Sequence, residues 1–184
     1  DIIDSDLDAH PLVKTKITFK VRNLIEQIAA TLRNYVYQSN VFYCPGVAFT
    51  HDLKNHIGGH FFNDNVWWTE DAEMNHRIQH AGIPIYYEDR AEIIHAPESI
   101  FHDLQSAHKI GQGKYSQVVY AGRDTFEESL SKTIARLLNG KIFKSLTDLY
   151  RYSKSPSVVA YSILWNMLYY LGYYRTLLKH KLSI

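Results

Sequence analysis

The sequence predicts an α/β fold in which a mixed sheet with flanking helices is followed by an all-helical C-terminal region. Residues 13–21 alternate between apolar and polar side chains, as a half-buried strand does. The next apolar residues recur every four positions over residues 24–36, as on one face of a helix. From about residue 114 onward every segment has a helical pattern. We therefore expect one unit over 1–122 and a helical region over 123–184.

The first elements follow from these two periodicities. The strand over 13–21 has one face of lysines and threonines, which we expect to be wet. The lysines on this strand are Lys14, Lys16 and Lys20. A helix is predicted from residue 23 to about 38, and an apolar run over 41–50 predicts a strand that is kinked by Pro45-Gly46.

A short helix over 51–57 is expected to end at Gly58-Gly59. The next helix, over 69–81, begins at Thr69, whose hydroxyl is expected to cap the first turn by accepting a backbone N–H. Gly82 ends this helix.

The remaining elements are two short strands over 84–88 and 91–95 and a helix from Pro97 to about 110. Gly111-Gln112-Gly113 is expected to end this helix. After this segment four further helices are predicted, over residues 114–121, 124–138, 141–152 and 157–180.

Charge is distributed unevenly along the chain. Residues 132–184 contain nine Lys or Arg and one acidic residue, a net charge of +8, whereas residues 1–131 carry a net charge of −7. A basic region of this kind favours an anionic partner. Its aromatic residues form one apolar block and are not interleaved with the basic residues, which argues against a nucleic acid.

The segment over 157–174 is apolar for about 18 residues, close to the lower limit for a membrane span. It contains six Tyr or Trp, which prefer the headgroup region, and Arg175 follows directly. We expect a helix that lies in the membrane interface. A full span, and a core helix that packs on its own domain or on a second subunit, are the alternatives.

Two adjacent tryptophans stand directly before an acidic helix start. A carboxylate in the first turn of a helix is stabilised in its charged form, so Asp71 is a candidate proton acceptor, with Glu70 beside it. Trp67 and Trp68 could form a flat platform for a sugar ring. The alternative is a capped helix whose acids only satisfy the helix dipole.

Two further clusters are candidates for ligand binding. Lys109, Gln112 and Lys114 surround glycines and could hold a phosphate or diphosphate, although a solvated helix end would have the same residues. Asp4 and Asp6 are two residues apart after an apolar pair, and their carboxylates could bind Mg²⁺ or Mn²⁺. An acidic loop is the alternative for this second cluster.

Taken together, these motifs resemble the C-terminal half of a family 2 glycosyltransferase. This family of inverting enzymes includes cellulose, chitin and hyaluronan synthases. The resemblance covers about residues 12–120 and includes "CPGVAFTHDLKNHIGG", "TEDAEMNHRIQHAG" and "SAHKIGQGKY". It implies a GT-A-like mixed sheet that is truncated at its N-terminal side, because the first strands, which bind the nucleoside, would precede Asp1.

The resemblance also implies roles for individual residues. Asp71 would deprotonate the acceptor hydroxyl, with Glu70 near the acceptor, and no covalent enzyme intermediate would form. His95 would stand where some relatives place a third metal ligand, beside Asp4 and Asp6. The three residues of the glycine segment, Lys109, Gln112 and Lys114, would lie near the diphosphate.

Two departures from the family pattern refine this expectation. The Gln-x-x-Arg-Trp motif of processive synthases is absent, since residues 105–109 read Gln-Ser-Ala-His-Lys, so transfer of a single sugar is favoured. The helix that normally follows the Asp-x-Asp motif has no room before Pro11, which leaves open a metal motif upstream of Asp1.

We therefore expect a metal-dependent, non-processive glycosyltransferase at the cytoplasmic face of a membrane. It would use a nucleotide-sugar donor and a sugar or lipid-linked acceptor, and it would bind no nucleic acid. The alternative is a non-catalytic, membrane-associated module whose helical tail forms a homo-oligomer.

Overall fold

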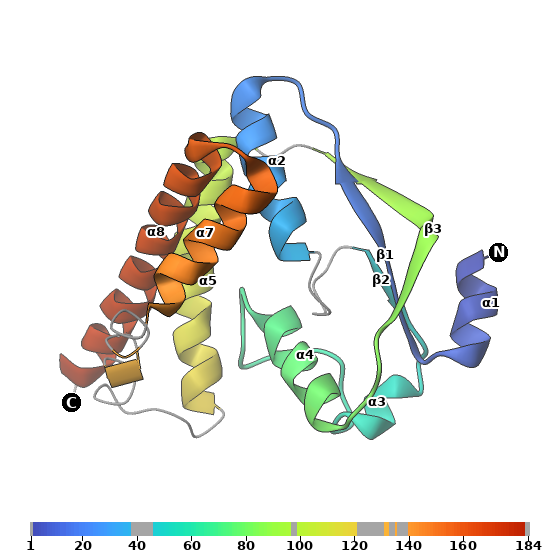
Figure 1. The fold of residues 1–184 in the computed structure, drawn as a ribbon. Coiled ribbons are helices and arrows are strands. Elements are labelled where there is room, and N and C mark those ends of the chain that lie inside the picture. The colour runs from blue at the N-terminus through green and yellow to red at the C-terminus, as the bar shows by residue number, and fades with distance from the viewer. Residues whose placement is uncertain are drawn as a thin grey trace.

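The chain folds into a small mixed sheet and a layer of long helices (Figure 1). The computed structural model describes residues 2–37, 46–96, 99–120, 131–132, 135 and 140–182. Its elements in chain order are α1 (Ile2–Ala9), β1 (Leu12–Phe19), α2 (Leu24–Tyr37), β2 (Val47–Phe49), α3 (Leu53–His56), α4 (Glu70–His80), β3 (Tyr86–His95), α5 (Ile100–Tyr120), α7 (Lys141–Ser153) and α8 (Pro156–Leu182). The predicted α/β class is confirmed.

The sheet has three strands in the order β2-β1-β3. Strand β1 pairs antiparallel with β2 and parallel with β3, so the sheet is mixed as predicted. The predicted strands over 84–88 and 91–95 are one strand, β3, with an irregularity in the middle. Thr15 pairs with Glu88, but the next residue of β1, Lys16, pairs with Glu92. The irregularity between these two pairs explains why the sequence suggests two strands.

The prediction of a wet lysine face on β1 is wrong for Lys14. Its side chain is buried, and its ammonium group donates a hydrogen bond of 2.6 Å to the carbonyl oxygen of Tyr37 at the end of α2. Burial lowers the pKa of Lys14 because the charged form loses its hydration. Lys16 and Lys20 are exposed as expected. Both faces of β1 are therefore covered at its N-terminal end only.

Two separate hydrophobic cores hold the fold together. The first joins the sheet to α3 and α4 through Leu12, Leu53, Ile57, Met74 and Ile78. The second joins α2, α7 and α8 through Ala29, Leu32, Leu149, Val158 and Tyr161. The buried residues of the two cores are different, and the space between the cores contains the cavity described below.

Helix α5 runs without interruption through the glycine segment that we expected to break it. A side chain at Gly111 would overlap the carbonyl oxygen of Tyr169, and a side chain at Gly172 would overlap the carbonyl oxygen of His108. The two glycines therefore let the backbones of α5 and α8 come into direct contact. These glycines allow the two helices to pack closely. From the sequence, the glycines of α5 were expected to let the backbone approach a ligand.

The C-terminal helices α7 and α8 agree with the predicted ranges of 141–152 and 157–180. Most of the predicted helix over 124–138, and residues 41–45 of the predicted strand over 41–50, lie outside the described residues. Among the residues that are described, no helix is long and apolar enough to span a membrane. Helix α8 packs against α2, α5 and α7.

Candidate functional site

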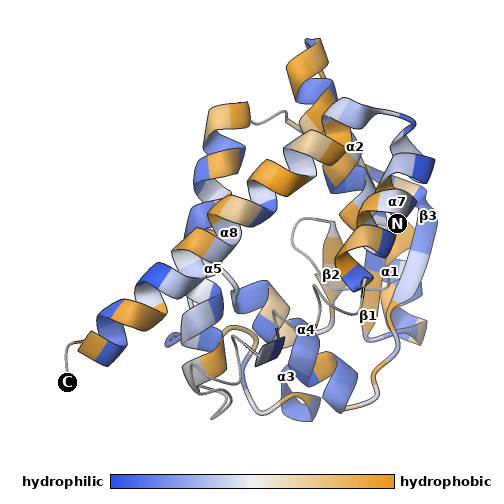
Figure 2. Ribbon diagram, turned by 60° about the vertical axis from the view of Figure 1, so that its left-hand side comes forward, coloured by the Kyte–Doolittle hydropathy of each residue, from blue (hydrophilic) through white to orange (hydrophobic). Residues whose placement is uncertain are grey.

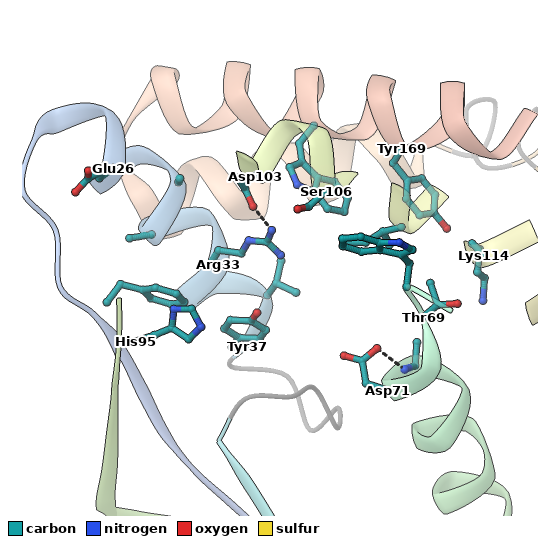
Figure 3. Close-up of a pocket in the computed structure, with 18 of the residues that line it drawn as sticks. Glu26, Arg33, Tyr37, Thr69, Asp71, His95, Asp103, Ser106, Lys114 and Tyr169 are labelled. Atoms are coloured by element: carbon teal, nitrogen blue, oxygen red, sulfur yellow. Dashed lines mark hydrogen bonds and ion pairs between the residues drawn. The ribbon is translucent and has the colours of Figure 1, made fainter. Parts of the chain in front are cut away.

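A cavity of about 580 Å³ lies between the two cores (Figure 3). This volume is within the range of small-molecule sites, about 300–1,000 Å³. The wall is built from the end of β1, helix α2, the start of α4, the end of β3, and helices α5 and α8. Polar side chains that reach it include Glu26, Arg33, Tyr37, Thr69, Asp71, His95, Asp103, Ser106 and Lys114. We refer to it as the central cavity.

Asp71 lies on the wall of the central cavity at the first turn of α4, as the sequence predicts. Its Oδ1 accepts a hydrogen bond of 2.7 Å from the backbone N–H of Ala72. Helix α4 begins at Glu70, so the positive end of the helix dipole favours the charged form of the Asp71 carboxylate. Glu70 does not line the cavity, and one oxygen of its carboxylate is buried without a hydrogen-bond partner among the described residues.

Thr69 occupies the N-cap position of α4, but its side chain does not cap the helix as we expected. Its carbonyl oxygen accepts the first helical hydrogen bond, 2.9 Å from the backbone nitrogen of Glu73. Its hydroxyl is buried at the cavity wall and has no hydrogen-bond partner in the described part of the chain. A buried hydroxyl without a partner costs about 1–3 kcal/mol.

Trp68 adopts a backbone conformation that is rare for a large side chain. Its φ is +66°, in the left-handed region where most residues other than glycine are strained. Strain of this kind persists only where surrounding contacts hold it, and it is concentrated at functional sites. The Trp68 indole lines the central cavity, and the ammonium nitrogen of Lys109 lies 4.7 Å from the centre of its ring.

Trp67 does not share this cavity, so the two tryptophans do not form one platform. Its carbonyl oxygen is seated against Gly113 of α5, where any side chain would overlap it. Its indole is 58% exposed and lines a second, shallower depression of about 320 Å³ between α5 and α8. The tight turn at Trp68 thus separates the two indoles into different sites.

The three candidates for diphosphate binding are also divided. Lys114 lines the central cavity and donates a hydrogen bond of 2.8 Å to the side-chain oxygen of Gln117. Lys109 contacts the Trp68 ring. Gln112 lines the depression beside Trp67. Of the three, only Lys114 is therefore in a position to meet an anion inside the central cavity.

The three candidate metal ligands are not brought together. Asp4 and Asp6 lie on α1, which is a helix and neither a loop nor the end of a strand. Burial raises the pKa of Asp6, and a hydrogen bond to Glu88 raises it further. Glu88 pairs with Thr15 of β1, whereas His95 pairs with Phe19, four residues further along the same strand. Glu88, beside Asp6, is therefore about 13 Å from His95.

These residues consequently do not fit a divalent cation as they stand. Within the part of the chain that the structure describes, no group of three or more Asp, Glu, His or Cys side chains is placed to hold a metal ion. His95 alone of the three reaches the central cavity.

His95 belongs to an aromatic corner at the far end of the cavity. Its ring lies 5.4 Å from that of Phe19, and Phe19 stacks at 6.1 Å on Tyr37. Nδ1 of His95 is 2.7 Å from the carbonyl oxygen of Ala96 and therefore donates to it. In the neutral ring this leaves Nε2 as the hydrogen-bond acceptor.

The wall opposite Asp71 contains an ion pair between a buried carboxylate and a partly buried arginine, which the sequence did not reveal. Asp103 of α5 is 2% exposed and accepts hydrogen bonds from Arg33 of α2 and from the Tyr161 hydroxyl of α8. It connects three helices around one charge. The sequence feature that could have indicated this ion pair is an acidic residue on the apolar face of α5, between Ile100 and Ala107.

Trp165 is another cavity residue that the sequence did not indicate. Its ring stacks at 5.9 Å on Tyr169, and the Arg33 guanidinium lies 5.6 Å from its centre. Its Nε1–H is buried and, among the described residues, has no hydrogen-bond acceptor. The cavity wall thus contains an unsatisfied donor at Trp165 and an unsatisfied hydroxyl at Thr69.

The chain matches no protein-family model. It also matches no curated protein sequence. The proposed function therefore rests on the residues of the cavity.

Proposed function

We propose that the chain contains the acceptor-binding and catalytic part of an inverting glycosyltransferase of the GT-A type, with the central cavity as its sugar site. The observation that carries this proposal is the Asp71 carboxylate in the first turn of α4, which shares the cavity wall with the Trp68 indole. A sugar can donate a hydroxyl proton to such a carboxylate while its ring stacks on the indole.

The aromatic content of the wall supports the same ligand class. The indole of Trp68 and the stacked pair of Trp165 and Tyr169 give flat apolar surfaces next to polar atoms. Apolar walls with a few converging polar groups are typical of small-molecule sites.

Asp71 is proposed as the general base. The acceptor hydroxyl loses its proton to the Asp71 carboxylate while its oxygen forms a bond to the anomeric carbon of the donor. The bond from that carbon to the diphosphate oxygen breaks, and the nucleoside diphosphate leaves with the electron pair. One direct displacement inverts the configuration and requires no enzyme nucleophile. Lys114 is the cavity cation best placed to face the departing negative charge.

The donor is proposed to be a nucleotide sugar and the acceptor a sugar or a lipid-linked sugar. Dependence on Mg²⁺ or Mn²⁺ remains a prediction of the family resemblance, and Asp4, Asp6 and His95 do not support it in their present positions. The ligands for an ion would have to come from other residues.

Membrane association is proposed from the outer face of α8. This face carries exposed apolar side chains at helical spacing, at positions 163, 164, 167, 171, 178 and 182. The helix contains no acidic residue, and its last turns carry Arg175, Lys179 and Lys181. Figure 2 shows apolar and polar segments alternating along α8. An apolar stripe beside cations is the pattern of a helix that binds an anionic membrane surface.

The same stripe supports a second candidate, a non-catalytic interaction module. Exposed leucines recur every seven residues at Leu164, Leu171 and Leu178, with Met167 between the first two. This spacing is that of a helix-pairing seam, which would join two copies of the chain. The net charge of +8 on residues 132–184 opposes such pairing and favours an anionic surface.

The catalytic proposal is tested with Asp71→Asn in the full-length context. We expect loss of about 10²- to 10⁴-fold in the release of nucleoside diphosphate from a panel of UDP-glucose, UDP-N-acetylglucosamine and GDP-mannose. Asp64→Asn, which removes an exposed carboxylate from the loop before α4, is the matched control and should keep activity. Both variants should retain the unfolding midpoint of the parent protein. Unchanged turnover in Asp71→Asn would remove this carboxylate from the mechanism.

A further inference from the structure

Helix α4 carries two exposed histidines, His76 and His80, in its last two turns. Side chains four residues apart lie on the same face of a helix, one turn from each other. The centres of the two imidazole rings are 6.3 Å apart, and the ring planes are inclined by 34°. We refer to these two residues as the α4 histidine pair. The pair is not among the residues that line the central cavity.

The fold fixes the direction in which the α4 histidine pair faces. Met74 and Ile78 of the same helix are fully buried in the first hydrophobic core. Each histidine lies two residues after one of these apolar residues, which is about 200° further around the helix axis. The pair therefore faces solvent, and α4 cannot turn it inward without exposing the core.

The end of α4 that carries the pair is anchored to the preceding loop. The Arg77 guanidinium donates hydrogen bonds of 2.5–2.7 Å to three backbone carbonyl oxygens of residues 57–61. The backbone N–H of Ala81 donates a hydrogen bond of 2.9 Å to the carbonyl oxygen of Arg77, so the helical turn is closed around His80. The two imidazoles consequently stand on a rigid backbone, which lowers the entropic cost of binding one ligand with both of them.

The distance between the rings suits one shared metal ion. Imidazole nitrogens bind first-row transition metals at about 2.0–2.1 Å. Because a ring centre lies about 1.1 Å behind its nitrogen, two rings on one tetrahedral or square-planar ion have centres about 4.5–5.2 Å apart. The rings of His76 and His80 are about 1 Å more distant than the upper value. Rotation about the side-chain bonds of two exposed residues supplies this approach.

We propose that His76 and His80 together bind one transition-metal ion, such as Cu²⁺, Ni²⁺ or Zn²⁺, at a site separate from the central cavity. Among the residues that the structure describes, no third His, Cys, Asp or Glu joins them. Both carboxylate oxygens of Glu73, one turn before His76, accept hydrogen bonds from Arg77. Two imidazoles therefore hold the ion, and water occupies its other coordination positions.

This site goes beyond the proposed function and does not depend on it. Imidazole suits Cu²⁺, Ni²⁺ and Zn²⁺, whereas Mg²⁺ prefers carboxylate, carbonyl and water oxygens. The ion of the α4 histidine pair is therefore of a different class from the Mg²⁺ or Mn²⁺ that a nucleotide-sugar donor would require. It would join the last two turns of the helix that carries Asp71 in its first turn.

The pairing of two imidazoles should raise affinity above that of a single histidine. Once one imidazole is bound, the second binds within the same molecule, and linkage of this kind increases overall affinity by about 10²-fold or more. Cu²⁺ should bind more tightly than Ni²⁺ or Zn²⁺, in keeping with the general order for nitrogen ligands. The chain contains ten histidines, so the experiment has to identify which of them hold the ion.

His56 and His60 provide a matched control because they are also exposed and four residues apart. Helix α3 ends at His56, and Gly58 and Gly59 both have a positive φ. These two rings are therefore not placed one turn apart on a single helix. If spacing in the sequence alone determined binding, this second pair would bind the ion as well as the α4 histidine pair does.

Isothermal titration calorimetry of the untagged chain with NiCl₂ measures binding at about pH 7.5, where most imidazoles are neutral. We expect His76→Gln and His80→Gln each to weaken binding at least about tenfold, since each removes one of two linked ligands. Glutamine has a helix propensity at least as high as that of histidine, so the unfolding midpoint measured in EDTA should be unchanged. The variant His56→Gln with His60→Gln should bind Ni²⁺ like the parent protein.

Electron spin-echo spectroscopy of the complex with one equivalent of Cu²⁺ counts the bound imidazoles. Two imidazoles in the parent protein and one in His80→Gln are expected. A single imidazole in the parent protein, or Ni²⁺ binding that His76→Gln and His80→Gln leave unchanged, would overturn the proposal. Displacement of Ni²⁺ by a moderate excess of Mg²⁺ would also overturn it, because such an ion would be held by oxygen ligands.

A further variant separates this proposal from the catalytic one. Asp71→Asn should bind Ni²⁺ with the affinity of the parent protein, because its carboxylate is not part of the α4 histidine pair. A failed transferase assay would then count against the proposed function alone. Equal Ni²⁺ binding by the parent protein and by the double variant His76→Gln with His80→Gln would count against the metal site alone.

Discussion

The ammonium nitrogen of Lys109 lies 4.7 Å from the centre of the Trp68 indole ring. This contact connects α5 to the strained residue directly before the helix that carries Asp71. Sequence reasoning assigned Lys109 to a diphosphate and Trp68 to an acceptor. Their contact instead suggests that Lys109 helps to hold Trp68 in its unusual conformation, and thereby positions the start of α4.

The interaction between Lys109 and Trp68 can be measured with a double-mutant cycle. We expect Lys109→Met and Trp68→Phe to show a coupling of about 0.5–1 kcal/mol in the free energy of unfolding, because a cation over an indole face gains this much near the surface. Urea denaturation of the four proteins gives the value. A coupling of zero would mean that the contact does not help to hold Trp68.

Thr69→Val should stabilise the free protein. Valine has the shape of threonine without the unsatisfied hydroxyl, so the free energy of unfolding should rise by about 1 kcal/mol in the absence of ligand. Thr69→Ser keeps the hydroxyl and is the matched control. Urea denaturation of both variants and the parent protein measures the effect. A less stable valine variant would contradict the view that this hydroxyl is unsatisfied.

Replacing Asp103 alone should lower the free energy of unfolding more than replacing both Asp103 and Arg33. Asp103→Leu leaves the Arg33 charge and the Tyr161 hydroxyl without their acceptor, and a loss of about 3–5 kcal/mol in the free energy of unfolding is expected. The double variant Arg33→Met with Asp103→Leu should recover at least about 1 kcal/mol of this loss. Denaturant titration measures both variants, and equal losses would contradict a direct coupling.

Glu88 should make the free energy of unfolding depend on pH in the acid range. Its hydrogen bonds to Arg90 lower the pKa of the carboxyl from 4.5 to about 2. A lowered pKa stabilises the folded state fully above pH 4.5, and this contribution is lost as the pH falls toward 2. Burial raises the pKa of Asp6, which has the opposite sign and reduces the net slope.

Glu88→Gln tests this dependence. The variant should flatten the fall of the unfolding midpoint over the acid range, and Arg90→Gln should do the same, since it removes the main cause of the lowered pKa. Thermal unfolding followed by circular dichroism across this range provides the measurement. An unchanged acid slope in both variants would show that another carboxyl controls it.

The outer stripe of α8 should determine retention on anionic vesicles. We expect Met167→Ser with Leu171→Ser to reduce retention and added salt to reduce it further, because apolar burial and charge attraction both contribute. Leu24→Ser, at another exposed apolar residue on α2, is the control and should bind normally. Co-sedimentation with liposomes gives the bound fraction. Retention that is indifferent to salt and to the stripe variants would argue against an interfacial α8.

Features set by neighbouring residues could be predicted from the sequence. The start of α4, the position of Asp71 in its first turn and the strand β1 follow from short patterns of charge and periodicity. The mixed sheet was also expected. In each of these cases local preference and the final fold agree, which makes short windows of sequence informative.

Features that depend on distant contacts could not be predicted. Arg33 and Asp103 are 70 residues apart, and nothing local shows that they pair. Gly111 of α5 suggested a ligand because the helix against which it packs, α8, begins only at Pro156. Lys14 was expected in water because the pattern of β1 cannot reveal that the end of α2 covers it. Tertiary packing decided each of these cases.

The division of the apolar interior into two groups has a thermodynamic consequence. Leu12 and Met74 belong to one group, whereas Leu32 and Val158 belong to the other. Asp71 lies on a helix of the first group and Tyr169 on a helix of the second, and both line the central cavity, so a molecule bound there would couple their melting. An occupied protein would then lose both groups in one cooperative transition, and an empty one could lose them in sequence.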